Sequence, residues 1–274
     1  MVNDFPQALT IAGTDSGGGA GVMADIKTMQ ENHVFAAAVV VAVTAQNTIG
    51  GVTDFMAMPT KLIDEQFQAV AEDLKIRAVK TGGMLADSQS VKTVVANLQK
   101  YDFGPLTVDP VMIAKGGARL LAEDAIATVR DELLPLATIL TPNLPEAEVL
   151  TEMHIRDEAT MQLAGHRLQE LGAKNVIVKG GHETSDTAND FVLLENGESF
   201  WVSAPRVETN RTHGTGDTLS SAITAELAKG ADVKTAIQRA KRYVSATIAN
   251  GIEVGHGHGP LNHWAGRQLK EEDD

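Results

Sequence analysis

Cysteine is absent from the 274 residues, and no run of 18 apolar residues occurs. The first absence excludes disulfides, thiolate metal sites and a thiol nucleophile. The second excludes a helical membrane span, so we expect no membrane partner. Residues 1–5 lack the basic and then apolar pattern of a signal peptide, and we therefore expect a cytoplasmic protein.

Basic residues are also scarce. The 23 Lys and Arg residues stand against 36 Asp and Glu residues, which gives a formal net charge of −13 at pH 7. Such a charge argues against nucleic acid as a partner. An anionic substrate would have to be held by local groups, against the overall field. The apolar fraction of 43% is ordinary and is enough for a full hydrophobic core.

The sequence is organised around the stretch Thr212-His213-Gly214-Thr215-Gly216-Asp217-Thr218, which leads directly into an apolar helical run. Gly214 and Gly216 allow a tight backbone turn. The free N–H groups at a helix N-terminus form a site for anions such as phosphate. Asp217 would repel a resting phosphate, so we interpret it as a base that acts on a hydroxyl group. The motif alone leaves open the alternative that Asp217 only caps the helix.

Short apolar segments alternate with amphipathic helices along the chain. Strands are expected at 8–13, 39–43, 77–80, 106–112, 138–143 and 175–182, with a hairpin of 190–194 and 199–202 around Asn196-Gly197. Helices are expected at 22–29, 61–74, 88–99, 123–134, 144–150, 157–171, 218–229 and 233–250. This alternation predicts a three-layer α/β/α sandwich with a mostly parallel sheet. No Ser/Gly/Pro-rich linker interrupts it, so we expect residues 1–274 to form a single domain.

Seven polar residues follow the expected strands directly: Asp15, Gln46, Asp109, Asn143, Glu146, Lys179 and Asp217. The carboxyl ends of parallel strands share one edge of a sheet, so these residues can converge. Phosphoryl transfer needs such a set: N–H groups and a cation for the phosphates, oxygen ligands for Mg²⁺, and a base. The glycine-rich segments 17–21, 180–181 and 214–216 could supply the N–H groups, and Lys179 the cation. The oxygen groups of Asp109, Asn143 and Glu146 could organise Mg²⁺, mostly through water.

Each of these residues also has a purely structural interpretation. Asn143 and Glu146 resemble a helix cap with an acid three residues later. Lys179 could lie along the surface, and Asp109 could form a turn before a proline.

The histidines at 256, 258 and 263 suggest a metal cluster by their spacing. The surrounding glycines and the lack of a nearby acid favour a structural loop instead.

Seven blocks of sequence carry a resemblance to a known family: 9–21, 43–48, 109–112, 141–147, 178–182, 213–216 and 255–260. With these blocks in this order, the chain resembles the hydroxymethylpyrimidine/phosphomethylpyrimidine kinases of thiamine biosynthesis, within the ribokinase-like superfamily. The resemblance runs from about residue 8 to 264. It implies a ribokinase-like fold, ATP and Mg²⁺ as cofactors, a hydroxymethyl acceptor and usually a homodimer.

The resemblance also implies roles for individual residues. Gln46 matches the residue that recognises the aminopyrimidine, and Asp25 and Met84 match positions that line its pocket. The expected site comprises catalytic Asp217, Gly214 and Gly216; substrate-binding Gln46, Asp25, Met84, Gly13 and Val111; cofactor-binding Lys179, Asn143, Thr212 and Thr215; and Mg²⁺ ligands Glu146 and Asp109.

The chain departs from the family pattern at two places. The family usually has cysteine where Asp217 stands, whereas the wider superfamily uses aspartate there as the base. The family usually reads Lys-Thr-Gly-Met, whereas residues 80–84 contain a second glycine, which could shift Met84.

The substrate is left open between two enzyme activities. The leading interpretation is phosphorylation of 4-amino-5-hydroxymethyl-2-methylpyrimidine and then of its monophosphate. The alternative is a pyridoxal kinase. Gln46 discriminates between them, because a carboxamide offers an acceptor and two donors to the amino group and ring nitrogen of an aminopyrimidine. A non-catalytic nucleotide or vitamin sensor on the same fold is a third interpretation, against which the intact Asp217 argues.

Overall fold

The computed structural model describes residues 4–112, 121, 123–180 and 186–270. Residues 115–117, together with Gly181 and His182 of an expected strand end, lie outside this part. The described chain contains one sheet with the strands β1 (Gln7–Gly13), β2 (Phe35–Asn47), β3 (Gly51–Ala57), β4 (Ile76–Thr81), β5 (Leu106–Val108), β6 (Ile139–Leu140), β7 (Asn175–Lys179), β8 (Thr187–Leu193) and β9 (Ser199–Pro205). Its helices are α1 (Gly21–Glu31), α2 (Thr60–Asp73), α3 (Ser88–Lys100), α4 (Glu123–Thr128), α5 (Leu144–Thr151), α6 (Glu158–Glu170), α7 (Thr215–Ala228) and α8 (Val233–Ala249).

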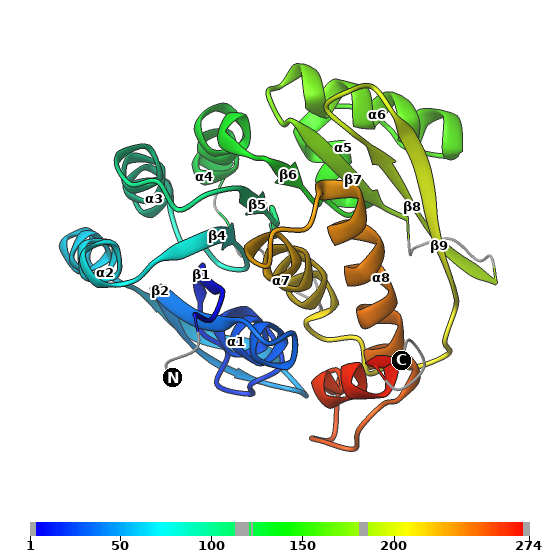
Figure 1. The fold of residues 1–274 in the computed structure, drawn as a ribbon, viewed down its shortest axis with the longest axis horizontal. Helices are drawn as coiled ribbons and strands as arrows, with labels where there is room; N and C mark the ends of the chain where they lie inside the picture. Colours follow the sequence, from blue (N-terminus) through cyan, green and yellow to red (C-terminus); the bar gives the residue numbers. More distant parts are fainter. Residues whose placement is uncertain (1–3, 113–120, 122, 181–185, 271–274) are drawn as a thin grey trace.

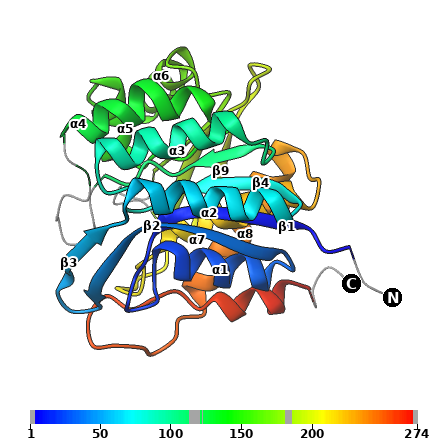
Figure 2. The same ribbon diagram turned by 90° about the vertical axis from the view of Figure 1, so that its left-hand side faces the viewer.

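The strands pair in the order β3-β2-β1-β4-β5-β6-β7-β8-β9. The six central strands, β2, β1, β4, β5, β6 and β7, run parallel to one another. The pairs β2–β3, β7–β8 and β8–β9 are antiparallel. Helices α1, α7 and α8 cover one face of the sheet and α2 to α6 the other (Figures 1 and 2). The predicted three-layer α/β/α fold with a mostly parallel sheet is therefore confirmed.

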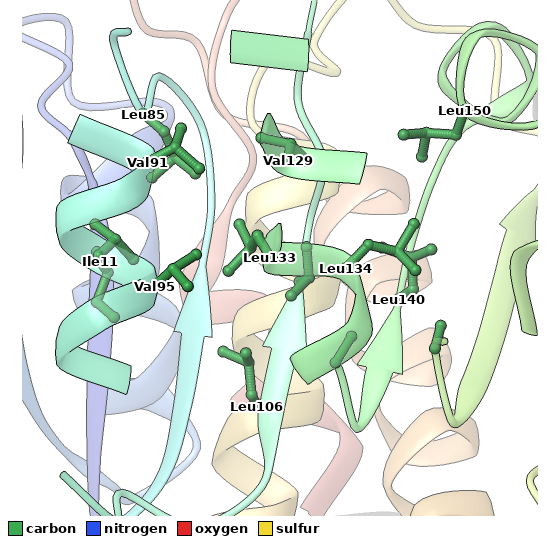
Figure 3. Packing of buried hydrophobic residues seen from close by; sticks show 14 of the residues in the cluster. Ile11, Leu85, Val91, Val95, Leu106, Val129, Leu133, Leu134, Leu140 and Leu150 are labelled. Carbon is green, nitrogen blue, oxygen red and sulfur yellow. The ribbon is translucent and has the colours of Figure 1, made fainter. Parts of the chain in front are cut away.

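Each face of the sheet has its own hydrophobic core. The larger core joins the sheet to α2–α6 and includes Leu9, Phe67 and Leu140. Figure 3 shows part of it, where Val95 of α3 (Ser88–Lys100) approaches Leu133 of the π-helical turn η1 (Val129–Leu133) and Val91 lies beside Leu85. Burial on both faces explains why the central strands are continuous apolar runs rather than alternating patterns.

Helix α7 is the most enclosed helix. Every residue from Asp217 to Ala228 is buried, because α7 packs between the sheet, α1 and α8 (Figure 1). Its small residues, mainly Ala, Ser and Thr, allow this close approach on all sides. The central position of α7 brings its N-terminus to the carboxyl ends of β1, β4 and β5.

Several expected boundaries were wrong. Strand β2 continues to Asn47 and turns into β3, with Gln46 opposite Val52, so Gln46 lies within a strand and not after one. Strands β5 and β6 are shorter than expected, and the helix expected at 123–134 changes to π geometry at Val129 and then to the 3₁₀ turn η2 (Leu134–Leu136). A further 3₁₀ turn, η3 (His263–Lys270), was not expected.

No helix in the described ranges is long and apolar enough to cross a membrane.

Candidate active site

A cavity of about 590 Å³ opens at the carboxyl edge of the central strands. Its wall contains all seven polar residues that were expected at this edge: Asp15, Gln46, Asp109, Asn143, Glu146, Lys179 and Asp217. It also contains Gly13, Met84, Val111, Thr212, Gly214, Thr215 and Gly216. The convergence predicted from the strand ends is therefore present in the structure.

Asp217 lies in the first turn of α7, but it does not cap the helix. The cap is Gly214, whose φ of 80° is left-handed. A Cβ at Gly214 would lie 1.8 Å from the carbonyl oxygen of Gly19, so only glycine fits there. The alternative that Asp217 serves as the helix cap is wrong. The Asp217 Oδ1 atom is buried without a hydrogen-bond partner in the described structure.

A buried lysine, Lys80 at the end of β4, lies beneath Asp217. Its Nζ is 2.6 Å from Asp25 Oδ1 and 3.8 Å from Asp217 Oδ1, and the Lys80 side chain has no exposed surface. Burial raises the pKa of Asp217 to about 6; Lys80 opposes this, while Asp25 and Asp109 add to it. Burial lowers the pKa of Lys80, but the carboxylates Asp25, Asp217 and Asp109 together outweigh this and raise it.

Asp25 does not line the cavity, contrary to the expectation. It is fully buried in α1, where it accepts hydrogen bonds from Thr10 Oγ1, Ser221 Oγ and Lys80 Nζ. Both carboxylate oxygens of Asp25 are occupied by these donors, and Asp25 contacts Lys80 rather than the cavity.

Asp109 and Lys179 form an ion pair in the cavity wall. Lys179 Nζ is 3.0 Å from Asp109 Oδ1, and the Asp109 side chain is fully buried. Thr141 Oγ1 also donates to Asp109, at 3.2 Å. Asp109 is thus not a simple turn residue, and Lys179, with 17% of its side chain exposed, does not lie along the surface. A Cβ at Gly216 would lie only 3.3 Å from Lys179 Nζ, so this glycine keeps the helix N-terminus close to the cation.

Asn143 and Glu146 form the helix cap that the structural interpretation predicted. The Asn143 N–H donates to Glu146 Oε2 and the Glu146 N–H to Asn143 Oδ1, both at 2.9 Å. Yet both residues also line the cavity. Burial raises the pKa of Glu146 to about 7; Lys179 lowers it and Asp109 raises it. The cap therefore presents a buried carboxylate to the same space as Asp109.

The apolar wall includes Met84 and Val111. Met84 has a left-handed φ of 62° and is 5% exposed. A Cβ at Gly13 would lie 3.0 Å from the Met84 Cβ, so Gly13 allows this close contact. The two glycines of the 80–84 segment differ: a Cβ at Gly82 would lie 2.7 Å from Lys80 Nζ, whereas a Cβ at Gly83 would lie 3.6 Å from Asp217 Oδ1, an ordinary contact.

The remaining expected residues form the loop before α7. The Thr215 hydroxyl donates to the Thr212 carbonyl oxygen at 2.8 Å, and both residues line the cavity. Of the histidines, His263 is buried and lies 3.2 Å from Thr218 Oγ1, whereas His258 lies in an exposed loop near the Asn210 carbonyl oxygen. No group of three or more possible metal ligands occurs among the described residues.

Sequence reasoning missed three cavity or near-cavity residues. Lys80 and His213 lie in the sequence motifs described above, but no role was predicted for them, and Lys241 of α8 was not predicted as a site residue. Lys241 Nζ is 2.6 Å from Asp190 Oδ2, and both residues line the cavity. Lys80 could have been predicted as a site residue, because it is a charged residue at the end of an apolar strand.

Solved structures share this fold. A Bacillus subtilis pyridoxal kinase, solved as an ADP complex, superposes with a TM-score of 0.89 at 32% identity, covering 97% of this chain and all of the other. A Clostridium difficile phosphomethylpyrimidine kinase gives a TM-score of 0.77 at 40% identity, covering 87% of this chain and 97% of the other. The fold and the site define a kinase of the ribokinase-like class, a phosphotransferase.

The sequence comparisons narrow this class. The pattern of the phosphomethylpyrimidine kinase family matches residues 15–262. The hydroxymethylpyrimidine/phosphomethylpyrimidine kinase of Haemophilus influenzae is 48% identical over 271 residues, which are 98% of this chain and all of that protein. The chain belongs to the phosphomethylpyrimidine kinase family.

Proposed function

We propose that this protein transfers the γ-phosphoryl group of ATP to the hydroxymethyl group of 4-amino-5-hydroxymethyl-2-methylpyrimidine, and then phosphorylates the monophosphate, in thiamine biosynthesis. The relatives that share nearly its full length are named for these activities. The observation that carries the proposal is the buried carboxylate of Asp217 in the first turn of α7, within the cavity wall, whose Oδ1 accepts no hydrogen bond from the described residues and lies 3.8 Å from the Lys80 ammonium group.

In the first reaction the hydroxyl oxygen of the acceptor attacks the γ-phosphorus. The bond from that phosphorus to the bridging oxygen breaks and ADP leaves, while Asp217 takes the hydroxyl proton. A pKa of about 6 keeps Asp217 mostly ionised at pH 7, so it can accept this proton. The N–H groups at the start of α7 and the Lys179 ammonium group stabilise the negative charge on the phosphates.

The donor set also fits Mg²⁺. Asp109 and Glu146 are buried carboxylates facing one cavity. Asp109 Oδ2 lies outside the ion pair with Lys179 and has a long contact of 3.5 Å with Ser220 Oγ, and Glu146 accepts from the backbone N–H groups of Asn143 and Met112. Mg²⁺ favours this arrangement, since it usually takes one or two carboxylates together with waters and substrate phosphates. When bound, Mg²⁺ would neutralise charge that develops on the phosphates.

A pyridoxal kinase is the second candidate, because the B. subtilis pyridoxal kinase is the better superposition of the two structures. The sequence identity favours the pyrimidine instead, at 40% against 32%. The test is a coupled ADP-release assay on the purified protein with the aminopyrimidine alcohol, with pyridoxal and without acceptor. The proposal predicts release that depends on the aminopyrimidine, and ADP release only with pyridoxal would refute it.

We also propose that the chain forms a single kinase domain, works in the cytoplasm, where ATP is available, and assembles as a homodimer. The hairpin of β2 and β3 supports the dimer, because it exposes Val43, Ile49, Phe55 and Met56, each at least 46% accessible. Replacing Phe55 and Met56 by Ser should give a monomer in light scattering. A wild-type monomer would refute this assembly.

A further inference from the structure

The side chain of Gln46 is held by a chain of contacts that starts in the glycine-rich loop. Asp15 Oδ2 accepts hydrogen bonds from the Gly19 and Ala20 N–H groups, both at 2.9 Å. The same oxygen is 2.9 Å from His213 Nε2, and His213 Nε2 is in turn 3.0 Å from the Gln46 carboxamide.

The imidazole of His213 is fixed from several sides. A Cβ at Gly19 would lie 2.7 Å from His213 Cδ2, so the ring is packed directly on that glycine. The His213 backbone N–H donates to the Gly259 carbonyl oxygen at 3.3 Å. The backbone of Gln46 is fixed too, since its backbone N–H donates to Ser16 Oγ at 2.7 Å.

One proton position follows from the contact with Asp15. Burial raises the pKa of Asp15, but the His213 hydrogen bond and the Gly17 and Gly19 N–H groups outweigh it and lower the pKa below the ordinary value. Asp15 is thus an ionised carboxylate, which only accepts hydrogen bonds. A bare nitrogen 2.9 Å from it would be repelled, so His213 Nε2 carries the hydrogen. This holds for the neutral and the protonated imidazole alike.

The orientation of the Gln46 amide then follows. An Nε2–H group on His213 cannot accept a hydrogen bond, so it cannot face the Gln46 NH₂ group at 3.0 Å. The two ends of a carboxamide have the same shape, and their hydrogen bonds decide which end is oxygen. We infer that His213 is a positioning residue for substrate selection: its single Nε2 hydrogen is shared between Asp15 Oδ2 and the Gln46 carbonyl oxygen in a bifurcated hydrogen bond, which turns the Gln46 NH₂ group to the cavity.

This inference rests on the proposed function and makes it more specific. Gln46 lines the cavity, and its free end is then a pair of donors. The ligand that fits this wall presents a hydrogen-bond acceptor, such as the ring nitrogen of the aminopyrimidine. This revises the expected pairing, because the Gln46 oxygen that would accept from the pyrimidine amino group is turned to His213. Gln46 is the residue that contacts the ligand, and the orientation of its carboxamide is set by His213 and Asp15, which need not touch the ligand.

The first test needs no variant. Long-range ¹H–¹⁵N correlation spectra of the wild-type protein should assign the hydrogen of neutral His213 to Nε2. A hydrogen on Nδ1 alone would overturn the inference.

The second test is a double-mutant cycle on the two acceptors, the aminopyrimidine alcohol and pyridoxal. His213→Leu should raise KM for the aminopyrimidine about tenfold, the effect of about one mis-set buried hydrogen bond, while kcat changes much less. His213→Gln restores a donor and should return KM to within roughly threefold of wild type. Adding His213→Leu to Gln46→Met should cost nothing further, because His213 acts through Gln46.

Two outcomes would overturn the inference: losses that multiply in the double variant, or a fall in kcat with KM unchanged. Gln46→Glu is the matched control, since a carboxylate still accepts from His213 but offers no donor to the ligand, and it should lose the aminopyrimidine. Thermal unfolding of each variant separates misfolding from these effects. Wild-type turnover with the aminopyrimidine tests the proposed function separately.

Discussion

Replacing Lys80 by Met tests how the site keeps its base ionised. In the wild type the Lys80 ammonium lies 3.8 Å from Asp217 Oδ1 and 2.6 Å from Asp25 Oδ1. Methionine has a similar length but no charge. The variant leaves two buried carboxylates, Asp25 and Asp217, near each other without the cation between them.

The size of the effect follows from this distance. Two unit charges about 4 Å apart interact by roughly 4 kcal/mol at an effective dielectric constant near 20. Since 1.36 kcal/mol corresponds to one pH unit, about three pH units is the upper limit for the change in the pKa of Asp217. Relaxation and water entry reduce it, and we expect at least about one pH unit.

The sign of the change is determined by the role of Asp217. The base works when deprotonated, and its pKa of about 6 means that wild-type kcat should fall as the pH drops through about 6. Without Lys80 this pKa rises, so the acid limb of the pH profile moves upward. At pH 7, Lys80→Met should therefore lose about twofold in kcat if the pKa rises by one unit and up to about 90-fold if it rises by three, and kcat should recover as the pH is raised to 9.

The assay is the pH dependence of kcat at saturating ATP, with KM for ATP as the internal control. Adding Asp25→Asn to Lys80→Met removes the second buried charge and should move the limb partly back. An activity loss that is equal at every pH would refute the reasoning, because it would indicate a structural defect. An unchanged profile would remove Lys80 from the account of the site.

Three further predictions follow from the same structure. Asp217→Asn should lower kcat by roughly 10²–10⁴ without changing ATP affinity; a near-normal kcat would mean that Asp217 is not the base. Activity should require Mg²⁺ or Mn²⁺, and Glu146→Gln should raise the concentration needed; full activity of the wild type in excess chelator would contradict this. Phe67→Ala should lower the free energy of unfolding by about 3–5 kcal/mol, because Phe67 is fully buried and its ring centroid lies 6.1 Å from that of Phe103. The exposed Leu62 in the same helix is the matched control, and equal losses in urea titrations of both variants would contradict the described core.

The central strands and most helices were predictable because their burial leaves a strong sequence pattern. Strands that are largely buried on both faces are mainly apolar runs, such as residues 8–13 and 39–42. Strand β3 was missed for the opposite reason: four of its residues, 53–56, are exposed, so neither an apolar run nor alternation marks it. The strand β2 was cut short at the same point, because its last residues depend on pairing with β3.

The membership of the site was also largely predictable, since strand ends of a parallel sheet meet at one edge. Depth was not. Asp25 and Lys80 are both charged and both close to Asp217, yet they lie under the cavity as a buried pair. Which side of a strand or helix a charged residue faces depends on packing between distant segments, here α1, β4 and α7. For the same reason the contacts of His213 with Asp15 and Gln46, 198 and 167 residues away in sequence, required the structure.

The most direct test of the central claim is a competition between acceptors. The purified protein is incubated with ATP, Mg²⁺ and equal concentrations of the aminopyrimidine alcohol and pyridoxal, and the phosphorylated products are quantified by mass spectrometry over time. We expect the aminopyrimidine monophosphate to form first and to be converted to the diphosphate, with pyridoxal phosphate formed at least about tenfold more slowly. Faster formation of pyridoxal phosphate, or the absence of any aminopyrimidine phosphate, would contradict it.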